Sequence, residues 1–369
     1  MNDTACSKES CSKESAQSEE AAWNAVAEWY HACFTGLVLS VVTRMGEPAA
    51  AEMIYEIFSR QRQERFLPGL KKLGIDGLPP AVAAAQYHYL SNHIGGVAVE
   101  YMYESDRKAW VRYSAPRWVW SGTALCAIPS SVSKAMLAGW HAQNGVSLGN
   151  PRLGFVCTKQ AMDGQSGLEG YYCEYDDDLQ PHERLRFARH EDAPDFDPAR
   201  APTLPTSSWP RIRLAKAHRN YAMEYMRTAF PVVLQLWGED VAGHILTMTG
   251  KLIGMQFYHQ IAGQLGCLPA GDVNGDNSAA AFARFIAALG EAQDDACEIT
   301  GQAGQWQVLQ SNPRFMRGIQ EMTPLLASAW ASLVDGALYA HNHRLALRME
   351  PSIEDGQNQI RWIITDSRA

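Results

Sequence analysis

The residues best suited to chemistry are concentrated in the first half of the chain. They are His88, His93, Glu100, Cys126, His141, Cys157, Cys173 and Asp176. The second half offers fewer such side chains, namely His244, His259, Cys267, Cys297, His341 and His343. Imidazoles, carboxylates and thiols serve as general bases, nucleophiles and metal ligands. We therefore expect one functional site per chain, formed mainly by the first half at its interface with the second.

His93 and Glu100 are the first candidates for proton transfer or metal ligation. His93 stands at the end of a predicted helix, just before Gly95-Gly96, and Glu100 lies on the strand that follows. Such a junction lies at the edge of a sheet, where pockets form. Two plainer roles remain open: a histidine is favoured at a helix C-terminus by the helix dipole, and Glu100 can face solvent beside Glu104. His88 precedes His93 by five residues, about 140° around a helix, so the two do not share a metal site.

Cys126, His141 and Cys173 are the secondary catalytic candidates. A thiol becomes a nucleophile when a neighbouring base lowers its pKa, and His141 on a predicted helix is the available base. Cysteines on apolar strand faces also serve as small hydrophobic residues, which is the alternative for Cys157 and Cys173. His341 is the counterpart of His141 in the second half, which favours a shared role in holding a helix to a sheet.

Aromatic residues near these candidates are expected to bind substrate. The residues predicted to line the site are His88, Tyr101, Trp110, Trp118 and Trp120. Aromatic rings gathered near a hairpin bend suit a flat apolar or heterocyclic ligand, and they also suit a core. The motifs GxSxG, GxxxxGK[ST], GxGxxG and HExxH are missing from the chain, which disfavours serine hydrolases, nucleotide-binding folds and zincins.

The elements that position these residues follow from periodicity. Residues 80–93 have helical spacing after a proline and end at a glycine pair. Residues 97–114 alternate along two strands around a turn at 105–108, which predicts a β-hairpin. A helix over 130–143 and a second hairpin, formed by the strands near 153–158 and 170–176, complete an α+β module.

The same order of elements recurs about 190 to 200 residues later. Gly46-Glu47 corresponds to Gly238-Glu239, His141 to His341 and Asp176 to Asp366. Further matches join Leu73-Gly74 to Leu265-Gly266, Pro116-Arg117-Trp118 to Pro313-Arg314-Phe315, and Asp163-Gly164-Gln165 to Asp355-Gly356-Gln357. Ordered landmarks at a long period indicate a repeat. The sequence predicts two tandem α+β copies, near 36–176 and 228–366. Each is expected to have an N-terminal helical hairpin and a four-stranded antiparallel sheet covered by helices, the two packing as a pseudo-dimer.

The predicted organisation has four parts. Residues 1–20 are polar and repeat the pentad CSKES, which indicates a flexible tail. Residues 21–190 form the first repeat and residues 212–369 the second, degenerate repeat. A Pro-rich linker over 191–211 joins them.

One known family resembles this pattern. Gly170, Cys173 and Tyr175 in GLEGYYCEYD follow the strand LGFVCTK and the bend SAPRW, and this order is similar to the L-2-amino-thiazoline-4-carboxylic acid hydrolase family. The resemblance covers about 100 residues of each repeat and implies hydrolytic opening of a small sulfur-containing ring. The chain departs from the family at Ala115, which precedes Pro116. The family is associated with a cysteine before this proline. A similar element order occurs in ligand-sensing modules related to the 4-vinyl reductase domain.

The composition disfavours several classes of binding partner. The 369 residues include 32 Lys and Arg against 40 Asp and Glu, for a net charge of −8, so nucleic acid is not expected. With no 18-residue apolar run, we expect no membrane partner. No N-terminal apolar segment with a cleavage site and no CxxC pair is found among the eight cysteines, which favours a cytoplasmic protein with reduced thiols.

The sequence thus favours a hydrolase or ring-opening enzyme that acts on C–N or C–S bonds of a small cyclic, heterocyclic or aromatic substrate. The alternatives are a non-catalytic module that senses a small ligand and a metal-dependent enzyme with His and Glu ligands. No cofactor is evident, a divalent metal is compatible with the side chains, and a homo-oligomer is compatible with the pattern.

Overall fold

The computed structural model describes residues 3–114, 120, 122–268, 276–302, 304–319, 322–354 and 357–366. Side chains are described from residue 18 onward, except at 353, 354 and 357. The chain divides into two compact units, each with one sheet. We name Val38–Pro210 the N-sheet unit, and Met1–Leu37 together with Arg211–Ala369 the C-sheet unit.

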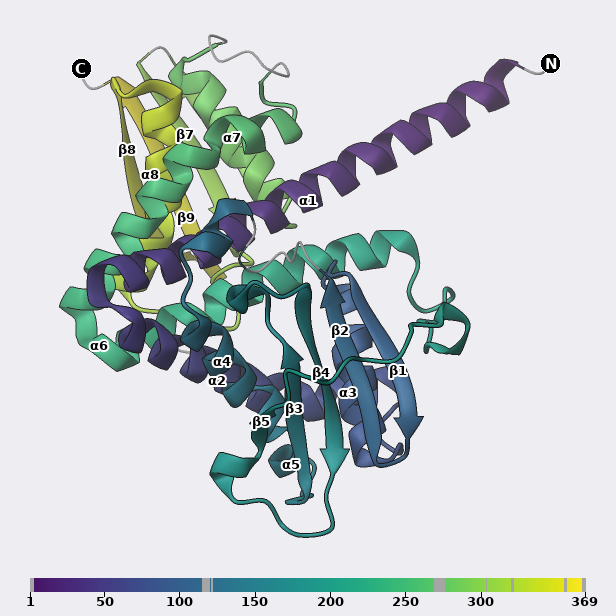
Figure 1. The fold of residues 1–369 in the computed structure, drawn as a ribbon. Coiled ribbons are helices and arrows are strands. Elements are labelled where there is room, and N and C mark those ends of the chain that lie inside the picture. The colour runs from purple at the N-terminus through teal and green to yellow at the C-terminus, as the bar shows by residue number, and fades with distance from the viewer. Residues whose placement is uncertain are drawn as a thin grey trace. The chain divides into compact units, whose positions relative to one another are not determined.

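The N-sheet unit holds a mixed five-stranded sheet in the order β1-β2-β4-β3-β5 (Figure 1). Its strands are β1 (Val99–Ser105), β2 (Lys108–Ser114), β3 (Leu153–Lys159), β4 (Gly167–Glu174) and β5 (Leu185–Phe187). Its helices are α2 (Glu47–Leu73), α3 (Pro80–Ile94), α4 (Ser130–Gly139) and α5 (Asn144–Ser147). Helix α3 packs against β1, β2 and β4, and α2 packs against α4.

The C-sheet unit holds an antiparallel four-stranded sheet in the order β6-β7-β9-β8. Its strands are β6 (Ala296–Gln302), β7 (Gln305–Ser311), β8 (Leu345–Glu354) and β9 (Gln357–Asp366). Its helices are α6 (Arg211–Gln264), α7 (Ala279–Glu291) and α8 (Pro324–Asn342). Ser278 and Thr323 cap the starts of α7 and α8, each accepting from a backbone N–H three residues on.

Two glycines break long helices in the same way. Helix α1 (Asp3–Met45) ends at Gly46, with φ 93° and ψ 169°, and α2 begins at the next residue. Helix α6 is interrupted at Gly238, with φ 74° and ψ 177°. A side chain with a Cβ rarely adopts this backbone conformation, which explains glycine at both positions.

The α+β class is confirmed, with several corrections. Strand β5 pairs parallel to β3, so the first sheet is mixed and has five strands where four antiparallel strands were predicted. Residues 3–20 continue helix α1, where a tail was predicted, because their Ala, Glu, Lys and Ser residues are tolerated in a helix. The predicted boundaries at 21, 190 and 211 stay predictions.

Among the described residues, one helical segment is long and apolar enough to cross a membrane. It is Ser18–Met45 in α1, whose apolar residues are interrupted by polar ones and so form no continuous run of 18. Within its most apolar 18-residue window, 83% of the residues are buried. Burial of this extent is typical of a core helix.

Candidate functional site

The two faces of the N-sheet unit's sheet differ in what covers them. We call the face against α3 the inner face and the opposite one the outer face. Because side chains alternate along a strand, Tyr172 lies on the inner face and its neighbours Tyr171 and Cys173 on the outer face. Met102, Trp110, Tyr171 and Val156 stand side by side in register across four strands on the outer face. All four are buried.

Trp110 and Tyr171 form the centre of this outer-face row. Their ring centroids lie 4.5 Å apart at an interplanar angle of 54°. Lys108 Nζ lies 4.9 Å from the Trp110 centroid and 4.3 Å from that of Tyr171, and it pairs with Glu104 at 3.1 Å. Trp110 Nε1 donates to the same carboxylate at 2.7 Å. The result is an aromatic surface with a fixed cation, a combination that suits a flat ligand.

A row of charged residues borders the aromatic row. Arg112 Nε donates to Glu100 Oε2 at 2.5 Å, and its Nη1 lies 3.6 Å from Glu169 Oε2. Glu169 is buried, and its Oε1 accepts from Thr158 Oγ1 at 2.7 Å. A buried carboxylate needs such partners because desolvation of its charge is costly. The outer face therefore presents carboxylates and a guanidinium beside two aromatic rings.

Residues 188–197, which we call the strap, cross this outer face after β5 (Figure 1). Ala188, Ala193 and Phe196 pack against the aromatic row, and Ala193 N donates to Glu169 Oε1 at 3.1 Å. Seven of these ten residues, 191–197, belong to the predicted linker over 191–211. The strap is thus part of the N-sheet unit and shields the row from solvent.

Lys159 holds the strap from the end of β3. Its Nζ donates to Glu191 O at 2.7 Å and to Arg189 O at 3.1 Å, and it pairs with Asp192 at 2.7 Å. Tyr171 Oη donates to Glu191 Oε1 at 3.3 Å. Most contacts of the strap with the sheet are therefore made by side chains rather than by a backbone ladder.

The corresponding face of the second sheet has another character. The row Thr300, Gln307, Ile363 and Arg348 crosses four strands there in register. Three of these four residues are polar or charged, which suits contact with water. The apolar outer face is thus specific to the N-sheet unit, where the sequence predicted the functional site.

The inner face carries a buried histidine cluster. His88 from α3 and His141 stack with ring centroids 4.1 Å apart, and His88 also stacks on Tyr172 at 5.7 Å. Asn144 Nδ2 lies 2.9 Å from His88 Nε2 and donates to Tyr172 Oη at 3.0 Å. Burial lowers the pKa of His88 to about 3. This cluster is sealed between helices and sheet and serves the core.

Cys173 and His141 do not meet, which removes the predicted thiol–imidazole pair. His141 stacks on Tyr172, whereas Cys173 lies on the outer face with the aromatic row. The error arose because alternation alone does not reveal which face of β4 meets the helices. Burial raises the pKa of Cys173, and that of Cys157 to about 12, so neither thiol favours its nucleophilic form.

The other predicted site residues are dispersed. His93 is exposed in the last turn of α3, and Cys126 is exposed in a short 3-10 helix. Tyr101 is buried on the inner face, and Trp120 is buried at a positive φ of 58°. Trp118 lies outside the described residues, as do the Pro116-Arg117 landmark and Ala115. Within the described part of the chain, no three His, Cys, Asp or Glu side chains are placed to hold a metal ion.

Gly170 of the resemblance motif has a packing role. A Cβ at this position would lie 2.6 Å from Phe155 Cζ and 2.3 Å from Val156 O. Glycine is therefore required for the Phe155 ring to lie across β4. The motif residue Cys173 contributes to the outer face, where Glu100 and Trp110 also lie.

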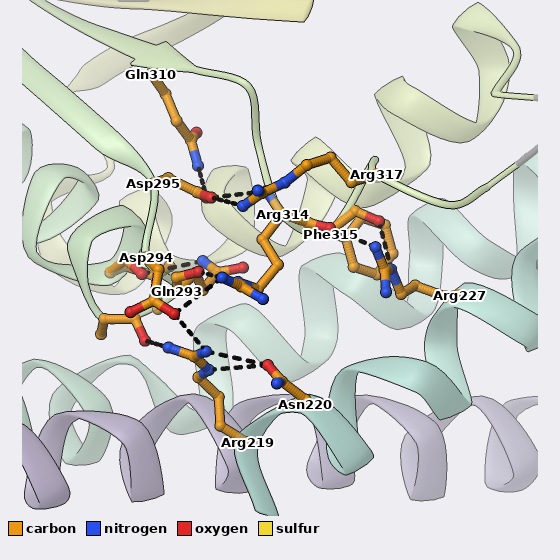
Figure 2. A network of polar contacts seen from close by, with 12 residues as sticks. Arg219, Asn220, Arg227, Gln293, Asp294, Asp295, Gln310, Arg314, Phe315 and Arg317 are labelled. Atoms are coloured by element: carbon orange, nitrogen blue, oxygen red, sulfur yellow. Dashed lines mark hydrogen bonds and ion pairs between the residues drawn. The ribbon is translucent and has the colours of Figure 1, made fainter. Parts of the chain in front are cut away.

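A second polar network, in the C-sheet unit, was not predicted. In Figure 2, Asp294 lies between two arginines, with Arg219 Nη2 at 2.7 Å and Arg314 Nη2 at 2.9 Å. Arg219 is almost fully buried and also donates to Ala292 O at 2.8 Å. Arg227 donates to the backbone oxygens of Arg314 and Phe315. These contacts hold the end of α7 to the turn after β7.

Asp295 is the most enclosed member of this network. Its Oδ1 accepts from Arg314 N at 2.7 Å and lies 3.3 Å from Arg317 Nη2, and its Oδ2 accepts from Gln310 Nε2 at 2.8 Å. Burial raises the pKa of Asp295 to about 6. With its side chain wholly inaccessible, the carboxyl has no route to a substrate, so we assign the network a structural role.

Asp295 should make the C-sheet unit less stable as pH rises from about 4 to about 6. In this window the unfolded chain has already lost the proton that the folded carboxyl retains, so folding is penalised by up to about 3 kcal/mol. Asp295→Asn is expected to abolish this fall in a series of urea denaturation curves. Asp294→Asn is the control: Arg219 holds the pKa of Asp294 below its ordinary value, so this change leaves the window from pH 4 to 6 intact. An unchanged slope in Asp295→Asn refutes the assignment.

Sequence reasoning missed Glu169, Arg112, Tyr171 and Lys159 as parts of the outer face. Their alternation was visible, but the strap that makes this face buried comes from residues beyond the module. The acidic pair Asp294-Asp295 directly after a helix, with Arg314 and Arg317 downstream, was the one signal for the second network.

Comparison with known proteins adds no family to this geometry: no family model, curated protein or solved structure matches the chain.

Proposed function

We propose that the chain binds a small flat aromatic or heterocyclic molecule on the outer face of the N-sheet unit. The supporting observation is the row of Trp110 and Tyr171 with Lys108 over both rings, bordered by Glu100, Arg112 and Glu169. Rings provide apolar area, and the few polar groups fix a ligand's orientation. The neighbouring row of Glu100, Arg112 and Glu169 is charged, so it offers a bound heterocycle both hydrogen-bond donors and acceptors.

Ligand binding should raise the unfolding temperature. A compound present at 100 times its Kd stabilises the folded state by about 2.7 kcal/mol. We expect some members of a panel of aromatic and heterocyclic amines, acids and amides to raise the midpoint of thermal unfolding. The effect should be lost in Trp110→Leu, which removes the ring from the row.

The matched control is Trp306→Leu, which removes a half-buried tryptophan from β7 of the other unit. This variant should keep the ligand-dependent rise. If no compound stabilises the wild-type chain, or if Trp110→Leu responds as the wild type does, the proposed site is wrong.

Ring-opening hydrolysis at this face is the second candidate function. It is favoured by Glu100, a half-buried carboxylate on the same face as Trp110, which is placed to move a proton of a bound ring. Glu100→Gln should then abolish turnover and leave binding intact. His93, exposed at the end of α3, is not part of this assignment.

We also infer that the two units derive from one duplicated module. The support is the shared order of the first four strands, β1-β2-β4-β3 and β6-β7-β9-β8, and the positive-φ glycines Gly46 and Gly238 at equivalent helix breaks. On this view the second copy kept the fold and has a polar outer face.

A further inference from the structure

The strap resembles a bound ligand in the way it contacts the outer face. It inserts the Phe196 ring beside the Trp110 and Tyr171 row and aims one N–H, that of Ala193, at the buried Glu169 carboxylate. It is held by the ammonium group of Lys159. The ring and the hydrogen-bond donor come from one segment without a strand or α-helix, and Lys159 at the end of β3 clamps that segment.

Two features make the strap separable from the sheet. At the start of the strap, Ala188 N donates a hydrogen bond to Cys157 O at 3.0 Å. Glu191 N then donates to Ala188 O and closes a local turn. Beyond this, side chains hold the strap, namely those of Lys159, Glu169 and Tyr171 on the sheet. Arg189 of the strap also pairs with Asp163 and donates to Gln165 Oε1 at 2.8 Å in the loop between β3 and β4. Segments with few backbone hydrogen bonds open at low free-energy cost compared with the strands beneath them.

We propose that residues 188–197 are a displaceable internal ligand of the outer face, which an external molecule replaces by placing a ring where Phe196 lies and an N–H group at Glu169. This inference rests on the ligand site proposed above. The acceptor at Glu169 decides the class of molecule. Once Ala193 N leaves, Glu169 Oε1 keeps the bond from Thr158 Oγ1 but loses its second donor, and a ligand N–H group restores that bond. An aromatic amine or amide meets this need, and a ring bearing only a carboxylate does not.

The state of the strap should then set the affinity. When only a fraction of molecules has the face open, the apparent Kd exceeds the intrinsic Kd by the inverse of that fraction. Weakening the strap therefore tightens binding, although no contact to the ligand is added. The two weakening variants are Lys159→Met, which removes the clamp, and Phe196→Ala, which empties the ring position.

The test uses 2-phenylethylamine and 3-phenylpropionate as probes, in calorimetric titrations of the full chain. We expect Lys159→Met and Phe196→Ala each to lower the Kd for the amine about tenfold, and the acid to bind neither variant. Asp195→Ala, at an exposed position of the strap, is the control and should leave the Kd unchanged. Equal affinity of the weakened and wild-type chains for the amine, or equal binding of amine and acid, overturns the inference while the ligand site stands.

Amide hydrogen exchange without any ligand separates the two proposals. Residues 188–197 should exchange faster than β2 and β4, and faster still in Lys159→Met. Exchange of the strap as slow as that of the strands overturns the inference directly. A strap that opens while no probe binds any variant refutes the ligand site, and with it the displacement of the strap by an external molecule.

Discussion

Acidification should destabilise the N-sheet unit through His88. Burial lowers the pKa of His88 to about 3, whereas an unfolded histidine titrates near 6.5. The unfolded chain therefore takes up a proton first, so the stability that neutral His88 permits is complete above pH 6.5 and is lost as pH falls toward 3. Between about pH 8 and pH 4.5 the expected loss is about 3 kcal/mol.

The geometry explains why protonation is resisted. Asn144 Nδ2 faces His88 Nε2 at 2.9 Å, and an amide donor there needs the ring nitrogen as an acceptor. With a proton on Nε2, the ring nitrogen of His88 and the amide nitrogen of Asn144 would both be hydrogen-bond donors facing each other in a buried site. The His141 ring, stacked at 4.1 Å, helps to exclude the water that would solvate a charged His88.

His88→Phe should remove this acid sensitivity. The ring keeps its stacking with His141 and Tyr172, and Asn144 keeps its bond to Tyr172 at 3.0 Å. We expect a loss of about 1–2 kcal/mol at pH 8 from the unmet amide donor, and a smaller further loss on acidification than in the wild type. His93→Gln, at the exposed end of the same helix, should retain the full acid sensitivity. Parallel pH profiles for His88→Phe and the wild type contradict the assignment.

A methyl group at Gly336 should disrupt the packing of α6 on α8. Its Cβ would lie 2.1 Å from Lys251 O, and a Cβ at Gly254 would lie 2.1 Å from Leu333 O. Both clashes are with backbone, which cannot rotate away, so the helices must separate. We expect Gly336→Ala to lower the free energy of unfolding by about 3 kcal/mol.

Gly263→Ala is the matched control in the same pair of helices. Nothing lies within 4 Å of a Cβ built there, and alanine favours a helix more than glycine does. This change should be neutral or should add up to about 1 kcal/mol. If denaturant curves give Gly336→Ala and Gly263→Ala the same free energy of unfolding, the close approach of the two helices is contradicted.

Local pattern was sufficient to predict most elements. The hairpin at 97–114 and the helix over 80–93 appear as β1, β2 and α3 because alternation and proline-to-glycine punctuation are properties of a few neighbouring residues. Helix α1 escaped prediction because its polar start resembles a tail in composition. Strand β5 escaped because its pairing with β3 depends on residues far apart in the chain.

The candidate site was harder to predict for the same reason. Alternation places Tyr171 and Cys173 on one face of β4, but residues 167–172 of this strand are buried on both faces. Which face meets the helices and which meets the strap is decided by tertiary packing. Partners such as Lys159 and Asp192, or Arg219 and Asp294, lie 33 and 75 positions apart and leave no local signature.

The central claim is that the outer face of the N-sheet unit is a ligand site. The most direct test is hydrogen exchange of the full chain with and without a stabilising aromatic amine from the panel. We predict altered exchange in residues 188–197 and slower exchange in β2 and β4, with the α7–β6 junction unchanged. Protection confined to the C-sheet unit, or the same exchange everywhere in both states, contradicts the claim.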